Sequence, residues 1–442
     1  MPGHVVDSGK KRFFKAVGIV LFLIAVAVVV GWNDARKEKV RADFSTFSLA
    51  ASRVMFAGGD PYDKLQVMHN YKYFPVNAIL LYPFSLVSVY AAQGMWFAFN
   101  LGLLMWAISS LRQMLRPVRI PWWVYLVVAL IMFRFVVMNF RLGQWNMSVF
   151  CLSIIGLRYI LDNRWWGGVL LGLAVTLKFM PAIFFIYLAT QRRWKDFSIT
   201  LASVLFWVLV FPAIVLGPAR TDELLRQYYT DSVERVNKMT SGHEVSSVSM
   251  HSTIYRAITP ATLELKGIVY RANVLDLSYN QAASIAKIIS AIFLGWFILW
   301  LMRQGKKREQ INELGALLII GLCYMAWFLA APGVRHAQLV STMPISLALV
   351  VAMHLVNNTT ARRVLATGIV MSVLLYSAPA EFKDKSRYNL MLEANGVLAW
   401  AMTVEFVMGI YAFYKVGIGP LPRRQWEVDE QGRSTLETLR YS

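Results

Sequence analysis

The sequence predicts an all-α protein that crosses a membrane many times, and three observations lead to this fold class. Hydrophobic residues make up 57% of the 442 residues, whereas soluble domains are about 45–50% apolar. Many stretches approach the roughly 18–20 apolar residues that a helix needs to cross hydrocarbon. Cations recur on alternate connections between these stretches, as they do on the cytoplasmic side of membrane proteins. We therefore expect a polytopic membrane protein with about 10–12 transmembrane helices.

The first apolar stretch begins close to the N-terminus. Lys10, Lys11, Arg12 and Lys15 precede it, as in a signal peptide, but no small-residue cleavage site follows and Trp32 indicates an interface. We therefore expect an uncleaved first span and a cytoplasmic N-terminus. Full spans are expected at residues 16–32, 91–111, 120–138, 146–161, 197–216, 281–302, 313–331, 337–355, 363–378 and 395–415.

The loop charges orient these spans. Clustered cations lie at Arg112, Arg116 and Arg119, at Arg158 and Arg164, at Arg303, Lys306, Lys307 and Arg308, at Arg362 and Arg363, and at Arg423 and Arg424. All of these positions fall on one side, which the positive-inside rule makes cytoplasmic. This bias and anionic lipid headgroups account for the net charge of +20, so membrane lipids are expected partners and nucleic acid is not.

The opposite side carries the long loops, 33–90 and 217–280, and the shorter 332–336 and 379–394. We expect one transmembrane domain over residues 1–415 and a cytoplasmic tail over 416–442. Residues 75–89 are apolar but contain Pro75 and Pro83, which favours a helix at the membrane surface over a span. The 217–280 loop is near-neutral and aromatic, and we expect it to cap a cavity.

Residues 167–190 conflict with the charge rule. Arg164 precedes this apolar stretch and Arg192 follows it, so both ends should be cytoplasmic. Pro181 can break a helix in the middle. The sequence thus predicts two half-spans that meet at residues 178–181, and broken helices at membrane depth are found where they line a cavity or pack in protein. One kinked span that violates the charge rule is the alternative.

Cysteine and motif content excludes several classes of function. Cys151 and Cys323 lie in apolar stretches and are expected to be small buried hydrophobes without a disulfide framework. No CxxC, HExxH or glycine-rich phosphate loop is present, so a soluble nucleotide-binding domain is not expected. The histidines and carboxylates show no zinc-ligand spacing.

Asp43 is the first candidate for catalysis. It lies about ten residues past Trp32, near the outer headgroup level by our topology. A carboxylate there can take a proton from a hydroxyl held at the membrane surface. From position alone, capping of the helix that follows is an equal alternative. Asp60, between Gly59 and Pro61, is expected to form a turn.

A second polar stretch, Arg141 to Asn146, follows the third span on the outer side. Gln144 and Asn146 suit sugar hydroxyls, Trp145 suits a sugar face, and Arg141 suits a phosphate. The alternative is a polar turn with a tryptophan anchor at the interface.

Other cations lie near or within the membrane. Lys178 sits at the expected helix break, where it can bind a lipid phosphate or snorkel to the interface. Arg134 has the same two interpretations. Arg335 and His336 lie between two spans on the same side as Asp43 and suit a phosphate leaving group, or are surface residues. His251, in the long outer loop, is a weaker candidate.

Three blocks taken together carry a resemblance. The first runs from Asp43-Phe44 through Ala57-Gly58-Gly59-Asp60-Pro61-Tyr62-Asp63 to Tyr71-Lys72-Tyr73-Phe74-Pro75; the second joins Gly143-Gln144-Trp145-Asn146, Gly168-Val169-Leu170-Leu171-Gly172-Leu173-Ala174 and Lys178-Phe179-Met180-Pro181; the third is Pro332 to His336. Their order resembles glycosyltransferase family 87, the DUF2029 group of the GT-C superfamily, over roughly residues 40–350. Its best-known members are polyprenol-phosphate-mannose-dependent α-1,2-mannosyltransferases.

The resemblance implies a GT-C fold with a large first outer loop, an active site on the outer face, a polyprenyl-phosphate sugar donor and inversion at the anomeric carbon. It implies Asp43 as the catalytic base and His336 as a functional residue near a late span. Arg335, Lys178 and Arg141 are then candidates for the donor phosphate. Two departures, Met250-His251-Ser252 in place of an Asn-Gln-Ser stretch and Phe74 in place of a first proline, bear on donor or acceptor identity.

The expected substrate site adds Tyr62, Tyr73 and His251 to Gln144, Trp145 and Asn146. We expect a metal-independent reaction, with a divalent cation as an open alternative, and no other cofactor. The expected partners are a polyprenyl-phosphate sugar, most readily mannose, and a lipid or glycan acceptor of the cell envelope at the outer face of the cytoplasmic membrane. A pentosyltransferase of the arabinose type and a non-catalytic lipid or sugar transporter are alternatives; transporters often show inverted repeats, and none is visible here.

Overall fold

The computed structural model describes residue 18 and residues 43–63, 71–116, 118–240, 247–260, 262–265, 268–271, 273–378, 391–392 and 394–421. These residues are helical apart from one short antiparallel hairpin and the connections between elements. The first expected span, 16–32, lies outside the described residues except for Gly18, as does the tail after Leu421. The all-α fold class is confirmed, and the division into domain and tail stays a prediction.

The elements form a bundle of long or paired helices and a second set, which we call the outer elements, at one end of it. The long or paired helices are α4 (Val89–Met114), α5 (Trp122–Leu142), α6 (Asn146–Leu161), α7 (Trp166–Leu177), η2 (Met180–Ala182), α8 (Ile183–Thr190), α9 (Trp194–Leu205), η3 (Phe206–Val210), α10 (Phe211–Leu216), α13 (Tyr279–Gly305), η4 (Arg308–Gln310), α14 (Glu313–Ala330), η5 (His336–Thr342), α15 (Met343–Leu355), α16 (Thr359–Ser377) and α18 (Val397–Val416). The outer elements are η1 (Phe44–Leu49), α2 (Ala50–Phe56), α3 (Pro75–Ser85), α11 (Pro218–Thr240), α12 (Met250–Ile258), β1 (Thr262–Leu265) and β2 (Ile268–Arg271).

Seven of the described helical stretches are long and apolar enough to cross a membrane. They are 89–114, 122–142, 194–216, 279–305, 313–330, 336–355 and 397–416, close to seven of the expected spans. Residues 146–161 form a shorter apolar helix, and α16 is a helix of 19 residues beside α18. The chain is thus a multi-pass membrane protein.

Polar side chains cap the N-termini of several helices. Ser278 begins α13 with a capping box, in which its hydroxyl accepts the N–H of Gln281 and the Gln281 side chain accepts from the Ser278 backbone. Asn312 and Asn358 cap α14 and α16 more simply, because each side-chain oxygen accepts one backbone N–H, from Gly315 and from Ala361.

Residues 167–190 turn back on themselves, as the charge pattern predicted. Helix α7 ends at Leu177 and α8 ends at Thr190, and Arg193 then donates a 2.7 Å hydrogen bond to Asn163, which precedes α7. The two cationic ends therefore lie together on one side. The alternative of a single kinked span is wrong.

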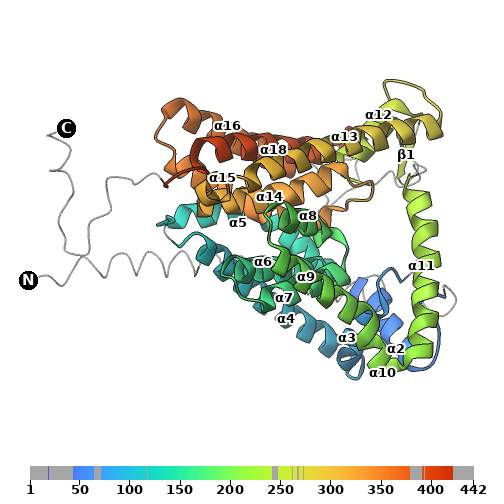
Figure 1. Ribbon diagram of the computed structural model, residues 1–442. Coiled ribbons are helices and arrows are strands. Elements are labelled where there is room, and N and C mark those ends of the chain that lie inside the picture. The colour runs from blue at the N-terminus through green and yellow to red at the C-terminus, as the bar shows by residue number, and fades with distance from the viewer. Residues whose placement is uncertain are drawn as a thin grey trace, which may run out of the picture.

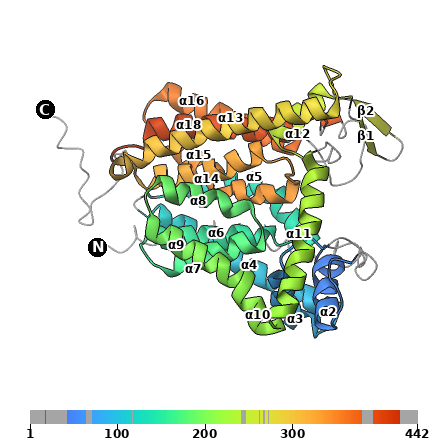
Figure 2. The ribbon, with the colours of Figure 1, turned by 45° about the vertical axis from the view of Figure 1, so that its right-hand side comes forward.

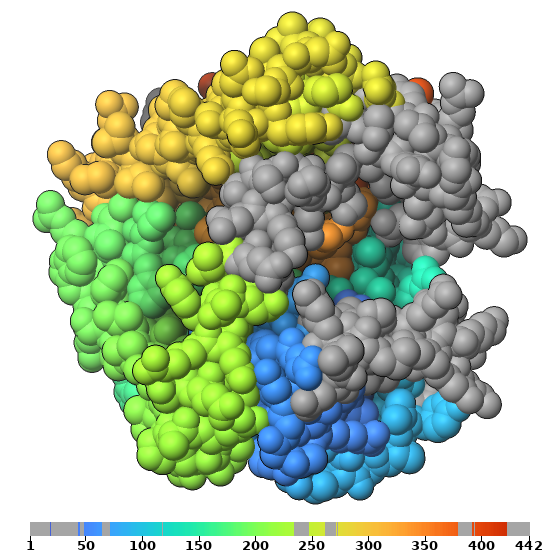
Figure 3. All heavy atoms as spheres, turned by 90° about the vertical axis from the view of Figure 1, so that its right-hand side faces the viewer, coloured from blue at the N-terminus to red at the C-terminus, as the bar shows by residue number. Residues whose placement is uncertain are grey.

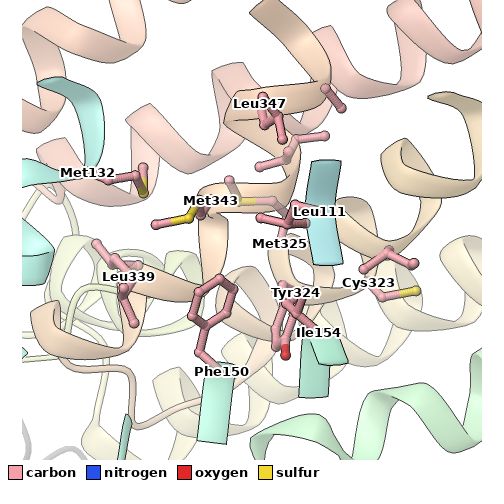
Figure 4. Close-up of a cluster of buried hydrophobic side chains, with 14 of the residues drawn as sticks. Leu111, Met132, Phe150, Ile154, Cys323, Tyr324, Met325, Leu339, Met343 and Leu347 are labelled. Carbon is pink, nitrogen blue, oxygen red and sulfur yellow. The ribbon is translucent and has the colours of Figure 1, made fainter. Parts of the chain in front are cut away.

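The core lies where α4, α5, α6, α14, η5 and α15 meet. Its buried side chains include Leu111, Phe150, Ile154, Tyr324 and Met343 (Figure 4). Cys151 and Cys323 are free and fully buried, as expected. Close approach of α6 and α7 depends on glycine, because a Cβ on Gly167 would lie 2.6 Å from the carbonyl oxygen of Gly156.

The outer elements gather at one end of the bundle, with α2 and α3 below α11 beside α10 of the bundle, and α12 and the β-hairpin above it (Figures 1 and 2). Helix α11 crosses this end from one group to the other. At its start Arg220 donates to the carbonyl oxygen of Gly59, 2.5 Å away, which ties α11 to the first outer loop. Seen end-on, this face is hollowed near its middle, and chain near residue 140 (blue-green) and near residue 340 (orange) is visible there (Figure 3).

Candidate active site

The turn between α5 and α6 brings the first outer loop against the bundle. Gly143 has φ 64°, which favours glycine, and a Cβ there would lie 2.7 Å from the Cβ of Phe44. Trp96 donates a 2.9 Å hydrogen bond to the Gly143 carbonyl and stacks on the Phe44 ring at 5.3 Å. Since Asp43 precedes Phe44, this packing sets the carboxylate beside the turn.

A chain of hydrogen bonds runs from the Asp43 carboxylate into the bundle. Gln144 donates to Oδ2 of Asp43. Asn146 donates to Oε1 of Gln144 at 2.6 Å, and Lys178 donates to Oδ1 of Asn146. Four residues that the sequence separates by up to 135 positions thus form one connected cluster (178 − 43 = 135). Asp43 thus accepts a hydrogen bond from Gln144, a side chain outside its own helix. The capping alternative did not predict this contact.

The helix break presents Lys178 to this cluster. Lys178 leaves the helical conformation, with φ −159° and ψ 131°, and α7 ends there. Asn77, fully buried on α3, donates a 3.2 Å hydrogen bond to the Leu177 carbonyl that the break leaves without its helical partner. Because its ammonium turns inward to Asn146, Lys178 does not snorkel to the interface.

Cations outnumber the carboxylate at this point. The Lys178 ammonium lies within electrostatic range of three other charges, since it is attracted by Asp43 and repelled by Lys72 and Arg335. Three cations facing one carboxylate leave a surplus of positive charge. Such a surplus suits an anion, above all a phosphate, which Lys and Arg bind readily.

The loop that carries Arg335 is held from two sides. Ser252 donates to the Pro332 carbonyl at 2.7 Å, and the Val334 N–H donates to Ser247 at 2.9 Å. Asn139 of α5 donates to the Ala337 carbonyl at 2.7 Å. Arg335 is exposed, whereas His336 is 7% exposed at the start of η5.

The structure brings together Asp43, Gln144, Asn146, Lys178 and Arg335 of the expected site. Two other cations lie on α5. Arg141 is half-buried in the last turn of this helix, two residues before Gly143, and its contact with a donor phosphate stays a prediction. Arg134, deeper in α5, donates to the Tyr376 carbonyl at 3.0 Å.

Trp145 does not occupy the position that we expected. It is 4% exposed and packs edge-on against Trp96 with ring centroids 4.8 Å apart. The ring is therefore part of the core, and the expectation that it stacks on a sugar is corrected.

The two outer-loop tyrosines hold the loop itself. Tyr62, 9% exposed, donates to the Tyr73 carbonyl at 2.9 Å and packs beside Tyr228 of α11 at 6.1 Å. Tyr73 lies against Tyr71, whose pKa burial raises well above its ordinary value. These rings join the first outer loop to α11, and a contact with substrate stays a prediction.

His251 faces another part of the fold. Its Nδ1 lies 2.9 Å from the hydroxyl of Ser290 on α13. Burial and the nearby Lys287 lower the pKa of His251, which favours the neutral ring. This ring nitrogen is bound to α13, and the expected contact of His251 with substrate stays a prediction.

Sequence reasoning missed four supporting residues. Lys72 adds a cation, Asn77 binds the end of α7, Asn139 binds η5, and Trp96 binds Gly143. A signal existed for the two asparagines, because each is a lone amide in an apolar helix and such groups need a partner when buried.

Within the described part of the chain, no three His, Cys, Asp or Glu side chains form a group that could hold a metal ion. The expectation of a metal-independent reaction stays a prediction.

A known protein family matches a region that contains most of this cluster. The family model, described as glycosyltransferase family 87, matches residues 71–332, more than half of the chain. The match includes Lys72, Gln144, Asn146 and Lys178, while Asp43 and Arg335 lie outside it. No curated protein and no solved structure matches.

Proposed function

Because the chain belongs to glycosyltransferase family 87, we propose that it moves a sugar, with mannose the first choice, from a polyprenyl-phosphate donor to a lipid or glycan acceptor. The reaction takes place at the outer face of the cytoplasmic membrane and inverts the anomeric carbon. Asp43 is the base. The cluster that joins this carboxylate to Lys178 is the observation that carries the proposal.

The cluster supplies both ends of such a transfer. An acceptor hydroxyl loses its proton to Asp43 as its oxygen bonds to the anomeric carbon. The bond from that carbon to the phosphate oxygen breaks on the opposite side, and the phosphate leaves with the electron pair. Lys178 and Arg335 stabilise the charge that gathers on the phosphate, and they do so best in a site poor in water.

Gln144 and Asn146 position the base, Asp43, and the cation, Lys178. The Gln144 amide donates to one oxygen of Asp43 and thereby fixes the plane of the carboxylate. Asn146 is fully buried and holds Gln144 and Lys178 at once. The separation of base and cation is thus set by Asn146, the first residue of α6, and by Gln144 in the turn before it.

The first test is the substitution Asp43→Asn, measured as transfer of labelled mannose from a polyprenyl-phosphate donor in detergent with a total lipid extract as acceptor. Removing a positioned base should lower the rate by about 10²–10⁴-fold. Asp60→Asn is the matched control, because Asp60 lies in the same loop and accepts the Tyr62 N–H at 2.8 Å to form a turn.

The assignment of the base fails if folded Asp43→Asn keeps near-normal turnover. Replacing the donor sugar by a polyprenyl-phosphate pentose separates the mannosyl proposal from the arabinosyl alternative. Wild-type protein that transfers neither sugar but moves the lipid across a vesicle membrane would support the transporter.

A further inference from the structure

A buried arginine joins outer segments that lie far apart in the sequence. Arg256 of α12 is 2% exposed. Its guanidinium donates hydrogen bonds to the carbonyl oxygens of Ser247, at 2.8 Å, and Ala394, at 3.1 Å, and to the hydroxyl of Thr253, at 3.3 Å. A planar guanidinium can bind several acceptors at once in a fixed arrangement. The chain at residue 247 and the chain at residue 394 are therefore held at set positions beside α12.

Ser247 passes this restraint on to the loop that carries Arg335. The Ser247 hydroxyl accepts the Val334 N–H at 2.9 Å, and the next residue, Val248, donates its own N–H to the Val334 carbonyl at 2.9 Å. Both polar main-chain groups of Val334 are thus bound to residues 247–248, and the Val334 side chain is fully buried. Since Arg335 follows Val334 directly, a shift of residues 247–248 would carry the Arg335 main chain with it.

Two more contacts hold α12 among its neighbours. Ser252 of α12 donates to the Pro332 carbonyl, at the start of the Arg335 loop, at 2.7 Å. The chain before α18 also approaches α12 closely, since a Cβ on Gly396 would lie 2.2 Å from Oγ1 of Thr253. The side chains and main-chain groups that bind the loop, which we call the α12 clamp, belong to Ser247, Val248, Ser252 and Arg256.

The side chain of Arg335, unlike its clamped main chain, is exposed and lies within electrostatic range of Lys178. A fixed cation stabilises a leaving phosphate only from a suitable position, and a displacement of about 1 Å costs up to about 10²-fold in rate. We propose that Arg256 is a positioning residue of the transfer reaction, because it sets, through the α12 clamp, the place from which Arg335 reaches the phosphate. This inference rests on the proposed function and assigns a role in it to a buried side chain outside the cluster of Asp43 and Lys178.

The kinetic test is a double-mutant cycle of Arg256→Lys and Arg335→Ala, measured as kcat for sugar transfer in detergent. An ammonium cannot bind two separate carbonyls with the geometry of a guanidinium, so Arg256→Lys alone should lower kcat about tenfold. In the Arg335→Ala background the same change should alter kcat by less than about twofold, because the side chain through which Arg256 acts is gone. A purely structural role would lower kcat by the same factor in both backgrounds, and this result would overturn the inference.

Arg53→Lys is the matched control. Arg53 of α2 also donates to two main-chain carbonyls, those of Ser85 at 3.2 Å and Val87 at 3.4 Å, in the outer connection between α3 and α4. Its replacement should leave kcat within about twofold of the parent value in both backgrounds. A loss as large as that of Arg256→Lys, with the same dependence on Arg335, would overturn the assignment to the α12 clamp.

Hydrogen exchange separates this inference from the proposed function, because it requires no activity. The Val334 N–H is bound to the Ser247 hydroxyl. Arg256→Lys and Ser247→Ala should therefore both speed exchange in peptides that cover residues 332–338, measured by mass spectrometry in detergent, and Arg53→Lys should not. Unchanged exchange in the first two variants would refute the clamp. Faster exchange, together with wild-type protein that transfers no sugar from any donor, would support the clamp and refute the proposed reaction.

Discussion

Single residues set the distance between the base and the rest of the site. Gly143 allows the turn into α6 and lets Phe44 approach to within contact, so it acts on Asp43 without touching substrate. Asn77 acts in a similar way on Lys178, because it binds the carbonyl that the helix break releases.

Gly143→Ala should lower both stability and activity. An alanine at φ 64° costs about 1–2 kcal/mol, and its Cβ would also displace Phe44 and the neighbouring Asp43. We expect a rate at least about tenfold lower in a protein that still folds, because a displacement of about 1 Å costs up to about 10²-fold. Turnover and thermal unfolding in detergent measure the two effects.

Gly58→Ala is the matched control for this prediction. Gly58 has φ 84°, yet among the described residues no atom beyond its two chain neighbours lies within 4 Å of the position that a Cβ would take. It should show a similar loss of stability and retain activity. Equal activity losses for the two variants would show that backbone strain, and not the position of Asp43, is the cause.

At the scale of elements, the hairpin α7–α8 is the unit on which the site depends. Its two ends are joined by Arg193, which is 6% exposed, pairs with Asp196 at 2.8 Å and binds Asn163 at 2.7 Å. Because the chain turns back at the tip of the hairpin, the two ends must be fixed for the tip to hold Lys178 beside Asn146.

Arg193→Ala should destabilise the protein by about 3–5 kcal/mol, because it leaves the buried Asp196 without its partner. Arg226→Ala should have an effect within about 1 kcal/mol, since the pair of Arg226 with Asp222 is exposed. Unfolding in a denaturing detergent measures both. A double variant that replaces Arg193 and Asp196 by apolar residues should recover part of the loss; a value as low as that of Arg193→Ala would contradict the ion-pair explanation.

At the scale of the whole molecule, the proposed topology predicts which residues a membrane-impermeant thiol reagent can reach. Cysteine at position 60 should react in intact cells, and cysteines at positions 164 and 192 should both react only after the membrane is opened. Cys151 and Cys323 are fully buried and should give a low background. Labelling of positions 164 and 192 from opposite sides would contradict the hairpin.

The sequence predicted this architecture well because its signals are local. The lengths of the apolar stretches and the charges of the loops indicated the spans. The cations Arg164 and Arg192 at both ends of one apolar stretch indicated the α7–α8 hairpin. Asp43, Gln144, Asn146 and Lys178 could each be nominated, but their connection depends on how three elements pack. Trp145 shows what the sequence could not predict. A tryptophan next to Gln and Asn can face a ligand or the core, and the sequence does not distinguish the two; here the ring is buried.

The hydrogen bonds of the cluster all run in one direction, with each donor on the Lys178 side and each acceptor on the Asp43 side. Lys178 donates to Asn146, Asn146 to Gln144, and Gln144 to Asp43, so each amide is polarised in the same sense between an ammonium and a carboxylate. A phosphate that draws the Lys178 ammonium toward itself weakens this polarisation and leaves Asp43 more basic. Donor occupancy would then raise the readiness of the base, so that proton removal from the acceptor is favoured once the donor is in place.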